Sequence, residues 1–117
     1  MFSRSIIAIS AYVALASAAA LDVFVPKITS PTASTVWKSG ALETVTWDTS
    51  NAPAQISNSG SIVLSDDGLP MATLASGFDL RSGSQDVTVP ENLAGTHYTI
   101  TLYGDSGNVS PVFEITA

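Results

Sequence analysis

The sequence predicts an all-β protein, and two observations support this prediction. From residue 21 onward no helical periodicity extends beyond one turn. Short runs rich in valine, isoleucine, threonine and aromatic residues recur instead, and each is followed by a cluster of turn-forming residues such as glycine, proline, asparagine and aspartate. Such short, regularly spaced runs are typical of a β-sandwich or barrel.

Seven runs have the length and composition of strands: residues 23–29, 43–48, 61–65, 72–78, 86–89, 98–103 and 112–116. Seven strands is the number found in immunoglobulin-like domains. We therefore predict an immunoglobulin- or fibronectin-III-like antiparallel β-sandwich of about seven strands, formed by residues 21–117.

Residues 1–20 have the pattern of a secretory signal peptide. Arg4 precedes an uncharged apolar run, and small residues follow it at positions 16–20. Cleavage after Ala18 and cleavage after Ala20 both fit. The apolar run is shorter than the ~20 residues that a membrane span requires. We expect a protein that is secreted to the extracellular space or the cell wall, with no membrane segment after cleavage.

The first strands alternate inward and outward residues. Val45 and Trp47 occupy every second position of the second strand, so we expect Trp47 to be a large core residue. Ile62 and Leu64 repeat this pattern in the next strand.

The C-terminal stretch 97–116 predicts a hairpin. One face of its first strand carries Tyr98, Ile100 and Leu102, and the turn-forming residues 104–108 then precede a second strand, in which Phe113 and Ile115 continue the same face. We expect all five side chains to be buried.

Charge and composition exclude several classes of function. Without Arg4, three cations remain against ten carboxylates, so nucleic acids and anionic membranes are not expected partners. The absence of cysteine excludes thiol catalysis and cysteine-ligated metals. The stability of the domain must therefore come from apolar packing.

No catalytic constellation is recognisable, and we predict no enzyme activity and no cofactor. His97 is the only histidine, and it is predicted to point outward with no nucleophile motif nearby. Asp66 and Asp67 belong to a turn sequence rather than to an opposed carboxylate pair. A weak candidate for calcium binding consists of Asp66, Asp67 and Asp105, which would require their loops to converge.

Exposed aromatic rings are the remaining candidates for ligand binding, because their apolar faces match the C–H face of a pyranose. We select Trp37 and Tyr103 as rings that could stack on a sugar. Each could instead cover a sheet edge.

Two stretches are candidates for glycosylation. Residues 29–35 are rich in hydroxyl groups and predicted to be extended, with Thr32, Ser34 and Thr35 as O-linked acceptors. Asn108 begins the only N-linked sequon, Asn-Val-Ser. Asn108 could equally serve to close the turn.

The mature chain resembles the fungal Kre/Knh-like cell-wall synthesis N-terminal domain family, also described as a Ser/Thr-rich glycosylphosphatidylinositol-anchored membrane family. The resemblance is carried by segments 28–31, 37–40, 45–53, 74–78, 98–100 and 103–113. It implies an extracellular β-sandwich without known catalytic residues, associated with β-1,6-glucan formation and wall assembly. The chain shows neither the Ser/Thr-rich tail nor the additional C-terminal region of many relatives.

The sequence thus favours a secreted, non-enzymatic module of the fungal cell wall or extracellular space that binds wall β-glucan or aids wall assembly. The alternative is a structural or effector-like domain that binds a protein and no glycan. A glycan-active enzyme is the third hypothesis. The sequence does not define the oligomeric state.

Overall fold

The computed structural model describes residues 24, 26–53, 59–104 and 107–117. The predicted signal peptide and its cleavage sites lie outside these residues. Within them the chain forms nine strands and one turn of 3-10 helix: β1 (Ile28–Ser30), β2 (Val36–Lys38), β3 (Leu42–Trp47), β4 (Gly60–Asp66), β5 (Leu69–Phe78), η1 (Leu80–Ser82), β6 (Ser84–Thr88), β7 (Gly95–Tyr103), β8 (Gly107–Val109) and β9 (Phe113–Thr116).

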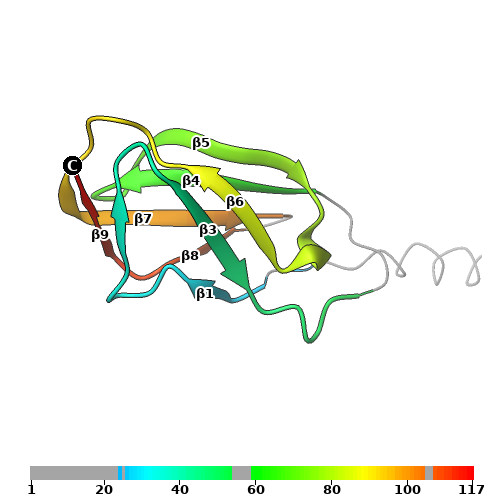
Figure 1. Ribbon diagram of the computed structural model, residues 1–117. Coiled ribbons are helices and arrows are strands. Elements are labelled where there is room, and N and C mark those ends of the chain that lie inside the picture. Colours follow the sequence, from blue (N-terminus) through cyan, green and yellow to red (C-terminus); the bar gives the residue numbers. More distant parts are fainter. Residues whose placement is uncertain (1–23, 25, 54–58, 105–106) are drawn as a thin grey trace, which may run out of the picture.

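The strands form two sheets that pack face to face (Figure 1). The smaller sheet has the order β1-β3-β6, and the larger has the order β2-β9-β7-β4-β5, with β8 also paired to β7. All pairings are antiparallel except that of β2 with β9. The prediction of an all-β sandwich is confirmed.

The core lies between the sheets and consists of the side chains that alternate inward. The five inward residues predicted for the C-terminal hairpin are at most 3% exposed: Tyr98, Ile100, Leu102, Phe113 and Ile115. Trp47 is 4% exposed, and its indole Nε1 donates a hydrogen bond of 2.6 Å to the carbonyl oxygen of Leu80. Its ring also packs against Phe78, with centroids 5.5 Å apart. The predicted core role of Trp47 is therefore confirmed.

Two strands were missing from the sequence prediction. The first stretch of the chain divides between the sheets, since β1 pairs with β3 and β2 then pairs with β9. The two missing strands, β2 and β8, have only three residues each, which is too short for an alternation pattern to be recognised. The cis Ser30-Pro31 peptide lies where the chain leaves β1.

Residues 31–35 form a hydrogen-bonded turn, so the prediction of an extended stretch is wrong. The Thr35 hydroxyl accepts a hydrogen bond of 2.8 Å from the backbone nitrogen of Thr32, and the backbone nitrogen of Thr35 donates to the Thr32 carbonyl. Such side-chain to backbone bonds allow hydroxyl residues to stabilise turns. This turn carries the chain from one sheet to the other.

The predicted C-terminal hairpin is broken into three pieces. Gly107 and Asn108 belong to strand β8 rather than to the turn. Ser110 then spans the gap between β8 and β9: its backbone nitrogen donates to the Ile100 carbonyl, and its hydroxyl accepts a bond of 3.0 Å from the Ile100 nitrogen. A side chain thus supplies one rung of the ladder in place of the backbone.

Strand β5 forms one edge of the larger sheet and contains three irregularities. Its ten residues face the seven residues of β4, and the register shifts by one residue at three points, leaving Met71, Leu74 and Gly77 as extra residues. Bulges of this kind bend an edge strand and increase its twist, which hinders pairing with another chain.

Candidate binding face

The side of β8, β7, β4 and β5 that carries Tyr103 has no Asp, Glu, Lys or Arg side chain. Residues directly opposite each other on paired strands share a face. The register places Tyr103 opposite both Ser61 and Gly107, and Thr101 opposite both Val63 and Val109. We call this surface the outer face and define it by the residues Ser61, Val63, Thr73, Ser76, Thr99, Thr101, Tyr103, Gly107 and Val109.

Tyr103 is the aromatic residue of the outer face, and 39% of its surface is exposed. A Cβ atom built on Gly107 would lie 2.9 Å from Cε1 of Tyr103 and 2.9 Å from Cγ2 of Thr101. Glycine at position 107 therefore makes room for the tyrosine ring to lie against the backbone of β8. This contact limits the movement of the ring while part of it stays accessible to a ligand.

The hydroxyl groups of the outer face surround this ring. Ser61 lies opposite Tyr103 on β4, Thr101 lies two residues before it on β7, and Thr73 and Ser76 extend the polar surface onto β5. Val63 and Val109 provide apolar surface between them, and Val109 is 63% exposed. Alternation along the sequence places Tyr103 and Thr101 on one face, but the hydroxyl groups of β4 and β5 could not be predicted, because strand pairing decides which of them come together.

Trp37 does not belong to this surface, and the prediction of an exposed ring there is wrong. Its side chain is 2% exposed and packs edge-on against Phe113, with ring centroids 4.7 Å apart. Trp37 pairs with Ile115 in register, so β2 turns it toward the core. The ring contributes to packing and is not available as a stacking platform.

The calcium site proposed from Asp66, Asp67 and Asp105 stays a prediction. Asp66 ends β4, where it pairs in register with Tyr98 of β7, and Asp67 follows it in the turn. Asp105 itself lies outside the described residues. No group of three acidic or histidine side chains able to hold a metal ion occurs in the part of the chain that the structure describes.

The O-glycosylation candidates remain predictions. Thr32 and Ser34 are exposed and Thr35 is half-buried, and their hydroxyl groups bond to one another at 3.1–3.2 Å. Asn108 has a structural contact, because its side-chain amide donates a hydrogen bond to the carbonyl oxygen of Pro26.

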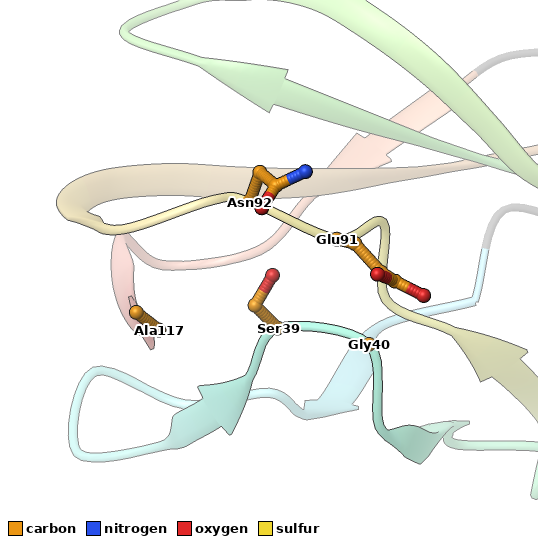
Figure 2. Close-up of a pocket in the computed structure, with 5 residues that line it drawn as sticks. All are labelled: Ser39, Gly40, Glu91, Asn92 and Ala117. Carbon is orange, nitrogen blue, oxygen red and sulfur yellow. The ribbon is translucent and has the colours of Figure 1, made fainter.

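A shallow pocket of about 400 Å³, which the sequence analysis missed, lies at the end of the sandwich where the strands β2 and β9 finish (Figure 2). Its lining residues are Ser39, Gly40, Glu91, Asn92 and Ala117. The Ser39 hydroxyl is already used twice, since it donates to the Pro90 carbonyl at 2.8 Å and accepts from the Leu93 nitrogen at 3.0 Å. These bonds join the β2–β3 and β6–β7 loops, so the Ser39 hydroxyl has a structural role.

Among the described residues, two carboxylates have a perturbed pKa, and both stabilise loops. Hydrogen bonds from the Arg81 side chain and backbone lower the pKa of Asp79, which caps the start of η1. The pKa of Asp48 is lowered mainly by hydrogen bonding to Ser50. The exposed His97 lies 3.5 Å from the Thr96 hydroxyl through Nδ1. Asp48 and Asp79 lie away from the outer face, whereas His97 lies on β7 two residues before Thr99 and points to the same side of the sheet.

None of the helices in the described residues has the length and hydropathy needed to cross a membrane. No curated protein matches the chain. A solved structure, described as fibronectin(III)-like modules of CbhA from Clostridium thermocellum, aligns with 78% of this chain and 43% of its own length, at 15% identity and a TM-score of 0.39.

The family comparison covers most of the sandwich. The model of the Kre9/KNH-like N-terminal Ig-like domain matches residues 30–115, from the end of β1 into β9. The matched region contains all strands of the outer face. The chain therefore belongs to the family of Kre9/KNH-like N-terminal Ig-like domains.

Proposed function

We propose that this domain is a secreted, non-enzymatic module that binds a neutral polysaccharide, wall β-glucan, on the outer face. The observation that carries the proposal is the absence of charge from this face in a chain whose formal net charge is −6. A surface that binds a neutral polyol needs hydroxyl groups and an apolar platform, and ionic side chains there would have to lose water without gaining a partner. The family is linked to the cell wall, which supports this choice of ligand.

Tyr103 is the stacking platform in this proposal. Its ring is held against Gly107, so little side-chain freedom is lost when a sugar covers the exposed part. The neighbouring hydroxyl groups of Ser61 and Thr101 lie on adjacent strands and can exchange hydrogen bonds with the sugar hydroxyls. A strand spacing of about 4.8 Å gives these groups a fixed separation across the sheet.

The alternative function is a structural or effector-like domain that binds a protein and no glycan. The half-buried Val63 and the exposed Val109 would also suit such a partner. A glucan pull-down followed by a reducing-sugar assay separates the hypotheses. Binding without product supports the module, no binding supports the alternative, and release of product indicates an enzyme.

The decisive variant is Tyr103→Ala. We expect it to bind insoluble β-glucan about tenfold more weakly than the parent, a loss of ~1.4 kcal/mol. The matched control is Leu42→Ala, since Leu42 is 68% exposed and faces solvent on the other sheet. Both variants should retain the urea unfolding midpoint of the parent within a small margin. Equal binding by the parent and a folded Tyr103→Ala variant would falsify the assignment of this ring.

A further inference from the structure

The only sequon of the chain, Asn108-Val109-Ser110, overlaps strand β8. The alternation of side chains along the extended backbone turns Asn108 and Ser110 toward the protein. An N-glycosylation sequon is read at its first and third positions, here Asn108 and Ser110. Side chains two residues apart on a strand share a face. Asn108 is half-buried and Ser110 is 6% exposed, whereas Val109 between them is 63% exposed.

The acceptor nitrogen of Asn108 is occupied by a contact with the N-terminal part of the chain. Nδ2 donates a hydrogen bond to the Pro26 carbonyl oxygen, and a carbonyl can only accept, so the nitrogen rather than the oxygen of the amide faces Pro26. The backbone of Asn108 is also paired with Leu102 of β7. Two separate parts of the chain therefore hold this residue.

The Ser110 hydroxyl is engaged as well. It accepts a hydrogen bond of 3.0 Å from the Ile100 nitrogen and donates one of 2.9 Å to the Pro111 carbonyl. The Ser110 nitrogen donates to the Ile100 carbonyl. A glycosyltransferase that reads this hydroxyl must first separate Ser110 from β7.

We infer that folding closes this modification site: Asn108 is N-glycosylated only on chains in which β8 has not paired with β7. In the reaction, Nδ2 forms a bond to the anomeric carbon of a lipid-pyrophosphate-linked oligosaccharide. The bond from that carbon to the pyrophosphate breaks, the lipid pyrophosphate leaves, and the amide gives up one proton. The folded domain offers neither the nitrogen nor the hydroxyl that this reaction requires, so occupancy depends on whether modification or folding occurs first.

A variant with a second sequon provides an internal comparison. Ala94→Thr creates the sequence Asn-Leu-Thr at Asn92, in the exposed loop before β7, without changing the Asn108 site. The folded variant, produced in bacteria and therefore unglycosylated, is incubated with purified oligosaccharyltransferase and a lipid-linked oligosaccharide. A synthetic peptide of residues 104–113 serves as the unfolded substrate. Glycopeptide masses report the occupancy of each asparagine.

We expect Asn92 and the peptide to be modified and Asn108 of the folded variant to remain at least tenfold less occupied than Asn92. Occupancy of Asn108 equal to that of Asn92 would overturn the inference. If neither asparagine of the folded variant is modified while the peptide is, the block belongs to the folded domain in general, and the assignment to the Asn108 contacts is wrong. An unmodified peptide would also overturn the inference, because the sequon would then be inactive even without β8.

Discussion

At the scale of single residues, Gly107 and Tyr103 show how a residue on one strand can fix the position of a side chain on its partner strand. The ring position depends on the missing side chain of its partner, since any Cβ at position 107 would lie 2.9 Å from the ring. Gly60 has a comparable function inside the sandwich, where a Cβ would lie 2.4 Å from Phe78. Both glycines are required by close packing rather than by backbone conformation.

The Asp79 carboxylate links stability to pH. Hydrogen bonds from Arg81 hold the folded-state pKa of Asp79 below the ordinary value of 3.8. Between these two pKa values the unfolded chain therefore binds more protons than the folded chain. The contribution of Asp79 is complete above pH 3.8 and is lost as the pH falls through the folded-state pKa. We expect the urea midpoint of the parent to decrease below about pH 4.

The variant Asp79→Asn keeps a side-chain oxygen that can cap η1. Its amide side chain cannot ionise, so it stays neutral at every pH. Its urea midpoint should therefore decrease less steeply in acid than that of the parent. Glu91→Gln, which removes a carboxylate from an exposed loop, serves as the control and should retain the parent's acid sensitivity. Identical acid profiles for Asp79→Asn and the parent would contradict the role given to Asp79.

At the scale of elements, the break between β8 and β9 depends on one hydroxyl group. Ser110→Ala leaves the buried Ile100 nitrogen without the acceptor that now lies 3.0 Å away. An unsatisfied buried donor costs about 1–3 kcal/mol, and we expect this loss in the free energy of unfolding from urea titrations.

Ser84→Ala is the matched control, because Ser84 is an exposed strand residue whose side chain lies on the surface of β6. Its effect should stay within about 0.5 kcal/mol of the parent. If Ser110→Ala is equally mild, a different acceptor must satisfy Ile100.

The long elements could be predicted from the sequence, and the short ones could not. Alternation over β7 identified Tyr98, Ile100 and Leu102 as core residues because six residues are enough to show a period of two. Strand β2 has three residues, so the same rule could not tell whether Trp37 faces the core. Its orientation is set by the pairing with β9, a contact between residues that are far apart in the sequence.

The candidate site shows the same division. Tyr103 could be selected because it lies on the outward face of a strand that alternates clearly. Its hydroxyl-bearing neighbours come from β4 and β5, and the register between those strands contains three shifts that no local pattern indicates.

At the scale of the whole molecule, the separation of charge from the outer face gives a prediction about salt. If a neutral polysaccharide binds there, no ion pair forms and few counterions are released. The fraction of the domain bound to β-glucan should therefore be constant between 50 and 500 mM NaCl. Over this range the Debye length falls from roughly 14 to roughly 4 Å, so an interaction between surface charges would weaken. A cationic protein partner would instead bind more weakly as salt increases, because the domain is acidic. Sedimentation of insoluble glucan with the domain at several salt concentrations measures this dependence, and a steep decrease would contradict binding on the outer face.

The parallel pairing of β2 with β9 determines how the sandwich responds to a mechanical load. The chain enters β2 from the turn that follows β1, and β9 ends beside the C-terminus, which is marked in Figure 1. Because the two strands are parallel, tension between the start of β2 and the end of β9 pulls them in opposite directions along their axes. The three paired residues and the flanking bond from Ser39 to Thr116 then share the load in shear, whereas an antiparallel pair pulled from adjacent ends would open one bond at a time. A module attached at both ends within a stretched wall would have its mechanical clamp at this short pair of strands.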